Sequence, residues 1–261
     1  MPTHFIPHGG GPCFFMDWDP PDTWNSMTEY LKGIGKTLPQ QPGAIVVVSA
    51  HWEEPEFSVT SHPQPELIYD YFGFPDHTYQ IKYPAPGSPA LAHEICSLLK
   101  KSGIPAREDK ERGFDHGVFI PFKLIYPEAN IPIVQLSLKH GLDPSGHLAA
   151  GRALAPLRQK NILIVGSGMS YHNLRRFFHG NDPASDTFDN WLTMAVTTHN
   201  TADRNNFLTQ WSHAPAAREA HPREEHLLPL MVVAGAADDG AGVRTFHDMV
   251  NGIALSGYSF T

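Results

Sequence analysis

Short runs of branched apolar residues alternate along the chain with longer stretches of mixed character. The runs at 46–48, 131–137 and 162–165 are rich in Val, Ile and Leu and are bounded by turn formers, which is typical of strands buried on both faces. An alternating segment at 57–61 and an apolar segment at 253–256 predict two further strands. Together these segments predict a central sheet.

Four helical patterns lie between or after these strands. The first, 88–103, opens with a Ser-Pro pair that suits an N-cap and a first helical turn. The second, 143–157, opens with Asp-Pro in the same way. The third is predicted to begin at 184–186, and the fourth to begin at 224–225 and run through Val233.

The alternation of strands and helices predicts one α/β domain over residues 1–261, with helices flanking a mostly parallel or mixed central sheet. A chain of 261 residues with 41% hydrophobic residues is large enough to bury a sizeable core. In such a sheet, ligands bind at the carboxyl ends of the strands. The metal or substrate site is therefore expected at that edge.

Charge and cysteine content exclude several classes of protein. Lys plus Arg number 19 against 27 for Asp plus Glu, a formal net charge of −8, so no nucleic-acid partner is expected. Cys13 and Cys96 are too few for a disulfide framework and lack the spacing of a thiolate zinc site. The sequence shows no secretory leader and no apolar run near the ~20 residues of a membrane helix, which predicts a cytoplasmic protein with no membrane partner. The oligomeric state is left open, and a homodimer is one option.

The stretch 69–89 interleaves six aromatic residues with prolines and a glycine, so it predicts a loop and no amphipathic element. Such a loop could simply pack its rings on the domain. Alternatively, it forms the wall of a binding site for a flat apolar ligand. Phe74 in this loop and Tyr171 elsewhere in the chain are the aromatic residues predicted to contact substrate.

Three histidines follow predicted strands or glycine-rich turns. His51 ends the first apolar run, His172 follows the run that ends in Gly-Ser-Gly, and His8 precedes three glycines that let the backbone turn and leave its ring unshielded. Each alone could be a histidine that caps a strand and bonds a carbonyl. Their shared placement favours a metal site with its own acid–base group, because imidazole serves both purposes near neutral pH.

Two more histidines have suggestive neighbours. Asp115 precedes His116, and the pair is either a carboxylate that steers an imidazole or a helix cap. Glu225 precedes His226 where a helix is expected to begin, and either side chain could be a further ligand. Ser167 lacks the Gly-x-Ser-x-Gly context of a serine nucleophile, so that role is discounted.

Six motifs, in order along nearly the whole chain, resemble the class III extradiol ring-cleaving dioxygenases, and most of all their DOPA 4,5-dioxygenase-like branch. They are His8–Pro12, Val47–Trp52, Tyr83–Pro89, Phe114–Gly117, Ile133–Ser137 and Glu225–Leu230. One position departs from the family: its usual opening is His-Gly-Ser-Pro, whereas Gly10 and Gly11 stand before Pro12 here.

The resemblance implies a non-haem metal at the sheet edge and cleavage of a catechol ring by O₂ beside its two hydroxyls. It implies His8 and His51 as metal ligands, with His226 as the third ligand and Glu225 as the alternative. Fe(II) is the expected metal, and Zn(II) also suits an all-imidazole site in the purified protein.

The resemblance also assigns acid–base and substrate roles. His172 matches the family's acid–base histidine and, in this branch, a further metal ligand, and His116 matches a histidine that contacts substrate and shares the proton transfers. A competing hypothesis keeps the fold and replaces oxygen chemistry with a zinc-bound water or with ligand binding alone.

Overall fold

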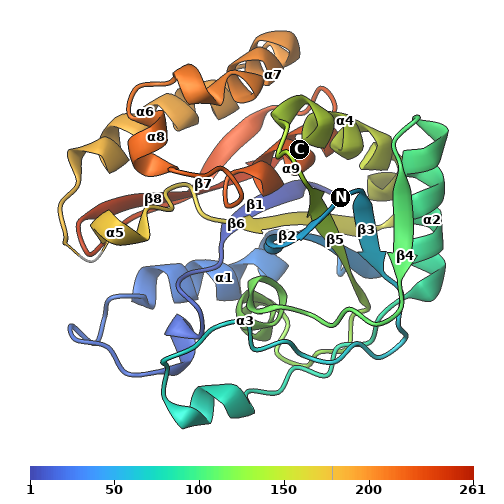
Figure 1. Cartoon of the computed structure of the whole chain (residues 1–261), viewed down its shortest axis with the longest axis horizontal. Helices are drawn as coiled ribbons and strands as arrows, with labels where there is room; N and C mark the ends of the chain where they lie inside the picture. Colours follow the sequence, from blue (N-terminus) through green and yellow to red (C-terminus); the bar gives the residue numbers. More distant parts are fainter. Residues whose placement is uncertain (178) are drawn as a thin grey trace.

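One eight-stranded mixed sheet forms the centre of the molecule (Figure 1) in the computed structural model, which describes residues 1–177 and 179–261. The strands are β1 Thr3–Pro7, β2 Ala44–Glu54, β3 Phe57–Thr60, β4 Ala106–Asp109, β5 Ile133–Lys139, β6 Ile162–Gly168, β7 Gly242–Val250 and β8 Ile253–Phe260. Their order across the sheet is β4-β3-β5-β2-β6-β1-β8-β7. The middle strands β5, β2, β6 and β1 are mutually parallel, and β8 and β7 add an antiparallel edge. The predicted α/β class with a mixed sheet is confirmed.

Helices cover both faces of this sheet. They are α1 Asn25–Thr37, α2 Pro89–Lys101, α3 His116–Ile125, α4 Pro144–Leu154, α5 Leu174–Phe177, α6 Pro183–Thr197, α7 Thr201–Thr209, α8 Ala217–Ala220 and α9 Leu228–Ala236. Short 3-10 segments are Cys13–Phe15, Asp76–Gln80, Ala155–Lys160 and Trp211–His213. Helices α1 and α3 lie below the sheet in Figure 1, and α4 and α9 lie above it. None of the helices in the two described ranges has both the length and the apolar character needed to cross a bilayer.

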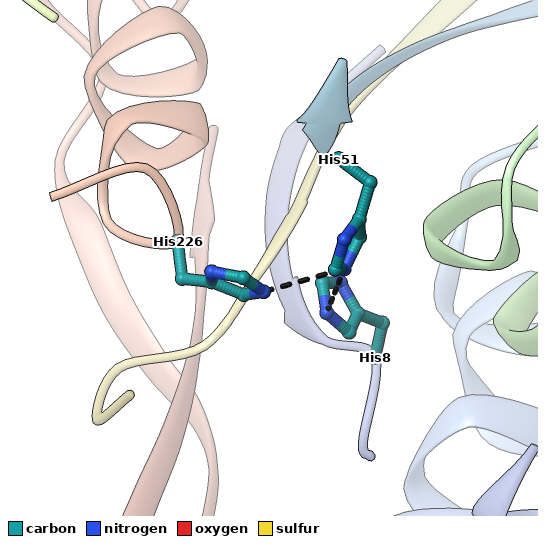
Figure 2. Close-up of side chains that lie close together, drawn as sticks. All are labelled: His8, His51 and His226. Atoms are coloured by element: carbon teal, nitrogen blue, oxygen red, sulfur yellow. Dashed lines mark hydrogen bonds between the residues drawn. The ribbon is translucent and has the colours of Figure 1, made fainter. Parts of the chain in front are cut away.

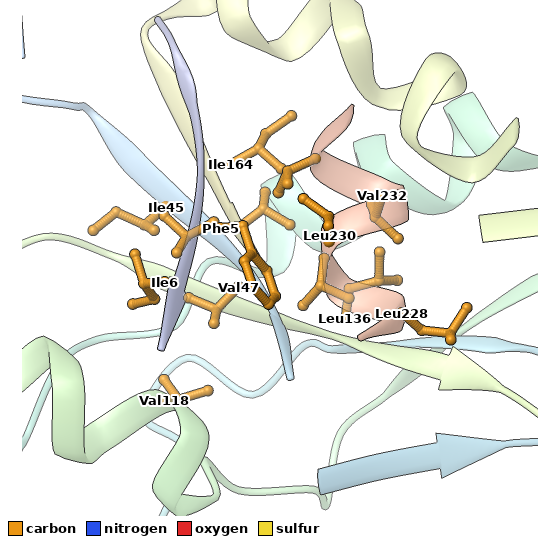
Figure 3. Packing of buried hydrophobic residues seen from close by; sticks show 14 of the residues in the cluster. Phe5, Ile6, Ile45, Val47, Val118, Leu136, Ile164, Leu228, Leu230 and Val232 are labelled. Carbon is orange, nitrogen blue, oxygen red and sulfur yellow. The ribbon is translucent and has the colours of Figure 1, made fainter. Parts of the chain in front are cut away.

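Helix α9 and the middle strands supply much of the core. All nine residues of α9 are buried, because the helix packs against α4 on one side and against β6 and β1 on the other. Figure 3 shows Leu230 of α9 near Ile164 of the sheet, with Val118 of α3 on the opposite side of the strands. Burying one such side chain contributes about 1.5–3 kcal/mol. This packing holds the segment just before α9 against the ends of the strands.

The predicted strands and most predicted helix starts are confirmed. Each apolar run overlaps β2, β3, β5, β6 or β8, although the run at 131–137 begins two residues before β5 and the segment at 57–61 ends one residue after β3. Ser88 caps α2 by accepting a hydrogen bond from the Leu91 amide, and Asp143 caps α4 in the same manner. Helix α6 begins at Pro183, just before the expected segment.

The predicted start of the fourth helix is wrong. Residues 224–227 form a turn, and α9 begins at Leu228. The carbonyl of His226, which a continuous helix would have bonded to the Leu230 amide, instead accepts a hydrogen bond from the Met169 amide at 3.0 Å. His226 is therefore free of the helical ladder and is tied to the end of β6.

Candidate metal centre

Three imidazoles from distant parts of the chain converge at the carboxyl edge of the parallel strands. His8 follows β1, His51 lies near the end of β2, and His226 lies in the turn before α9. Nε2 of His51 is 3.1 Å from Nε2 of His8 and 3.3 Å from Nε2 of His226. Figure 2 shows the three rings turned toward one another.

The separations of these nitrogens suit a single metal ion. With metal–nitrogen bonds of about 2.0–2.1 Å, two ligands on one ion lie roughly 3–3.5 Å apart. The three donor atoms lie within 4.8 Å of one another. Among the described residues, the donors that meet here are all imidazole nitrogens, with no carboxylate in the set of three. The chain therefore offers three nitrogen donors that a single ion could share.

Burial keeps these rings neutral, which is the form that binds a metal. His8 is 1% exposed and His226 is 4% exposed. Burial, followed by the electrostatic effect of the neighbouring imidazoles, holds the pKa of both well below the usual 6.5. Burial and His116 lower the pKa of His51 in the same way, while Asp70 opposes the shift. The expectation that the glycines leave His8 unshielded is wrong, because the ring lies beneath the neighbouring histidines.

Glu225 joins the predicted ligand His226 to His172, the predicted acid–base residue. Its Oε1 accepts from Nδ1 of His226 at 3.0 Å and lies 3.1 Å from Nδ1 of His172. The two rings stack with centroids 3.4 Å apart. Burial alone would raise the pKa of Glu225, but the hydrogen bond from His172 and the charges nearby hold it below its usual value. The carboxylate thus orients both rings, and Nε2 of each remains available.

His116 is steered by a carboxylate, but by Asp70 instead of its neighbour Asp115. Oδ1 of Asp70 accepts from Nδ1 of His116 at 2.8 Å and from its backbone amide at 2.9 Å. The same carboxylate has its Oδ2 3.7 Å from Nδ1 of His51. The ring of His116 lies 3.9 Å from that of His51, centroid to centroid. The sequence offered little signal for Asp70, which is one of two acidic residues, with Asp76, inside the aromatic loop.

Asp115 has a different task. It stands at the N-cap position of α3 without making a side-chain cap, and it accepts hydrogen bonds from Ser49 and Gln135 and pairs with Arg112. Burial raises the pKa of this carboxyl, and Asp70 adds to the effect. The network binds the start of α3 to β2 and β5, directly beneath His51.

Backbone contacts of β6 hold His8 and His226, two of the predicted ligands, in place. Its Gly168 carbonyl accepts from the His8 amide at 3.1 Å, and the next amide, Met169, donates to the His226 carbonyl. A Cβ atom on Gly168 would overlap that His226 carbonyl, and one on Gly166 would overlap the backbone of Pro229. The glycines of this strand therefore admit the chain's own backbone, a role that the sequence alone did not reveal.

Aromatic side chains border the imidazoles on one side. Tyr71 lies 5.8 Å from His116 and 5.5 Å from Phe74, ring centroid to ring centroid. Phe74 packs against the glycine turn after His8, where a Cβ on Gly11 would come within 3.0 Å of its ring. Tyr171, in contrast, is 1% exposed and its hydroxyl donates to Asp182 at 2.6 Å. The structure brings Phe74 to the site, whereas the Tyr171 side chain is buried and its hydroxyl proton is already donated to Asp182.

Comparison with known proteins identifies the family of the chain that carries these histidines. Residues 2–261 match the family model described as the catalytic LigB subunit of aromatic ring-opening dioxygenase. The chain belongs to the LigB family. As a LigB-family member it is an enzyme, an extradiol aromatic ring-opening dioxygenase.

Several LigB-family relatives resemble this chain along nearly its whole length. A 4,5-DOPA dioxygenase extradiol from Beta vulgaris is 39% identical over 99% of this chain and 96% of its own. One from Escherichia coli (strain K12) is 38% identical over 99% of this chain and 92% of its own. A crystal structure of an uncharacterized protein from Escherichia coli K12 is 33% identical, covers 100% of both chains, and superposes with a TM-score of 0.81.

Proposed function

We propose that residues 1–261 form one catalytic domain that uses Fe(II) and O₂ to cleave a catechol-type ring beside its two hydroxyls. The observation that carries this proposal is the convergence of the His8, His51 and His226 nitrogens at the edge of the sheet. These residues would hold the metal through Nε2. When bound, the metal would orient the catechol and O₂ beside each other and accept charge from the ring oxygens.

The identity of the metal is part of the proposal. Non-haem Fe(II) oxygenases commonly use two histidines and one carboxylate, whereas the three donors here are imidazoles. Glu225, the alternative ligand, has its Oε1 hydrogen-bonded to His226 Nδ1, which favours His226 as the third ligand. Since a nitrogen-only set also suits Zn(II), zinc in a purified sample would not exclude iron in the working enzyme.

We propose proton-transfer roles for two further histidines. Nδ1 of His172 faces Glu225 and Nδ1 of His116 faces Asp70, so Nε2 of each ring is the nitrogen left for a substrate. We assign His172 the removal of a phenolic proton and its return during ring opening. His116 would contact the substrate and assist. General acid–base catalysis of this kind contributes typically 10²–10⁴-fold.

The aromatic loop supports a flat substrate. Phe74 and Tyr71 offer ring surfaces close to His116, and we propose Phe74 as part of the wall that the catechol contacts. The names of the Beta vulgaris and Escherichia coli relatives make DOPA the first catechol to test. Cys13 and Cys96 are both free and buried, which suits the reducing cytoplasm that we propose as its location. A homodimer remains compatible with this assignment.

Anaerobic reconstitution with Fe(II), followed by air and a panel of catechols that includes DOPA, tests the proposal. We expect consumption of one O₂ per catechol and a yellow ring-opened product, identified by mass spectrometry as substrate plus both oxygen atoms. His51→Ala should abolish both signals. Bound iron without O₂ uptake on any catechol would contradict the proposal and favour the zinc-based alternative, for which ester and amide hydrolysis with Zn(II) is the matching assay.

A further inference from the structure

Ser167 lies at the centre of the strand ends that carry the ligands, and its side chain is fully buried. It is the penultimate residue of β6, paired in register with Ile6 of β1 on one side and Ser49 of β2 on the other. Its Oγ is 3.0 Å from Nδ1 of His8. It is also in very short contact with the carbonyl oxygen of Gly117, in the first turn of α3.

Counting protons decides the direction of both hydrogen bonds. A serine hydroxyl has one proton to donate, and a carbonyl oxygen can only accept. Ser167 must therefore donate to Gly117, and the hydroxyl oxygen can only accept from His8. Nδ1 of His8 then carries the ring proton, and Nε2, which faces His51 at 3.1 Å, carries the lone pair.

Among the described residues, no other side chain than Ser167 bonds Nδ1 of His8. Across residues 1–177 and 179–261, the hydrogen-bond partners of the His8 ring nitrogens are Ser167 and His51. His226 differs, because the carboxylate of Glu225 holds its Nδ1. His8 thus depends on a neutral hydroxyl whose own proton is fixed by the backbone of α3.

We infer that Ser167 is a positioning residue of the metal centre, which fixes His8 as the Nδ1–H tautomer and leaves its Nε2 bare for the metal. The inference rests on the proposed metal-dependent function. It assigns the Gly166–Gly168 segment two tasks on its two faces: the glycines admit the backbone before α9, and the serine orients the first ligand. Outer partners of metal-bound histidines typically contribute 10–100-fold to metal affinity.

The tautomer of His8 can be measured in the wild-type protein, without any substitution of Ser167, first in the absence of metal and then with zinc. Long-range ¹H–¹⁵N spectra of the chelator-treated wild-type protein, with His8 assigned by its absence in His8→Gln, should show the proton on Nδ1. Spectra of the zinc-loaded protein should show Nε2 bound to zinc and Nδ1 still protonated. A wild-type His8 protonated on Nε2, or bound to zinc through Nδ1, would overturn the inference.

Metal affinity provides the second arm. Ser167→Ala should weaken Zn²⁺ binding, measured by competition with a chelator, by about 10–100-fold. Ser137→Ala is the matched control, because Ser137 is equally buried and accepts one backbone hydrogen bond, from Ser58, away from the histidines. The control should keep the wild-type Zn²⁺ affinity. Equal affinities in both variants would refute the role of Ser167, whereas a wild-type protein that binds no metal would refute the proposed function and leave the tautomer result standing.

Discussion

At the scale of single residues, five histidines at one edge of the sheet are distinguished by what their second ring nitrogen contacts. His226 and His172 share Glu225, and His116 uses Asp70. A carboxylate partner holds each ring in one orientation and one tautomer. The remaining ring nitrogen then distinguishes the three rings: in His226 it faces His51, another predicted ligand, whereas His172 and His116 lie beside the predicted ligand set.

Substitution at the third ligand distinguishes His226 from Glu225. We expect His226→Ala to weaken Zn²⁺ binding by more than the roughly 10- to 100-fold that the loss of an outer partner costs. Glu225→Gln keeps a group that can accept from Nδ1 of His226, so it should fall within that smaller range. Chelator competition measures both values. A larger loss in Glu225→Gln than in His226→Ala would make Glu225 the ligand.

Substitution of the proton-transfer residues should lower turnover more than metal binding. We expect His172→Gln to reduce kcat by about 10²–10⁴-fold with the metal content of the protein unchanged. His77→Gln is the matched control, since His77 is exposed and only donates to the Phe15 carbonyl. Steady-state O₂ uptake and metal analysis give the two quantities. A full loss of metal from His172→Gln would instead identify His172 as a ligand.

At the scale of elements, the sequence predicted what local pattern determines and missed what tertiary packing determines. The apolar runs of β2, β5 and β6 identified buried strands, and a Ser-Pro pair located the start of α2. Strand β1 went unpredicted because Thr3–Pro7 is short and contains two polar residues, which become buried only between β6 and β8.

The residues of the candidate site also fall into those that the sequence predicted and those that only the structure reveals. The sequence pattern singled out the five histidines and the resemblance assigned their roles, and the structure gathers them into one cluster. Neither the pattern nor the resemblance identified Asp70, Ser167 or the contact of Gly168 with His226, because these depend on which segments meet across the sheet. Asp115 was the nearest carboxylate in sequence to His116, but its side chain turns into the buried network beneath His51.

Because β6 lies so close to the segment before α9, we can predict the effect of a substitution in β6 on stability and on metal affinity. Gly168→Ala would place a methyl group against the His226 carbonyl, which must shift together with its ring. We expect a loss of about 1–3 kcal/mol in the free energy of unfolding and a weaker metal affinity. Gly10→Ala, where no atom lies within 4 Å of the added methyl, should change neither quantity. Urea denaturation and chelator competition test both variants. If Gly168→Ala keeps the wild-type stability and metal affinity, the turn that contains His226 can shift without cost and the prediction is wrong.

At the scale of the whole molecule, the predicted ligands come from both ends of the chain, so binding of a metal by them would be linked to folding. An unfolded chain cannot bring residues 8, 51 and 226 together, so an ion bound by them would stabilise only the folded state. At a free metal concentration 100 times Kd, the stabilisation is about 2.7 kcal/mol. We expect chelation to lower the Tm, and His51→Ala to abolish this difference. A Tm that is indifferent to metal in the wild-type protein would contradict a bound ion at this site.

Buried histidines away from the metal centre make the stability of the fold depend on pH. His147 donates from Nδ1 to the Asp143 carbonyl and accepts at Nε2 from the Lys139 amide, and burial lowers its pKa to about 4. An unfolded histidine has a pKa near 6.5, so between pH 6.5 and 4 protons bind preferentially to the unfolded chain. Stability is therefore complete above pH 6.5 and falls as the pH drops, by up to about 1.4 kcal/mol per unit for this residue.

Urea denaturation of the metal-free protein at pH 7.5, 6.0 and 5.0 measures this loss. His147→Gln should be less stable at pH 7.5, since it loses a buried ring, yet its stability should fall less steeply between pH 6.0 and 5.0 because the titrating group is gone. His140→Gln changes an exposed histidine of the same region and should keep the wild-type slope. An unchanged slope in His147→Gln would mean that the folded protein accommodates the protonated ring. That outcome would require both the bond from Lys139 and the surrounding packing to give way at mildly acidic pH without unfolding the sheet.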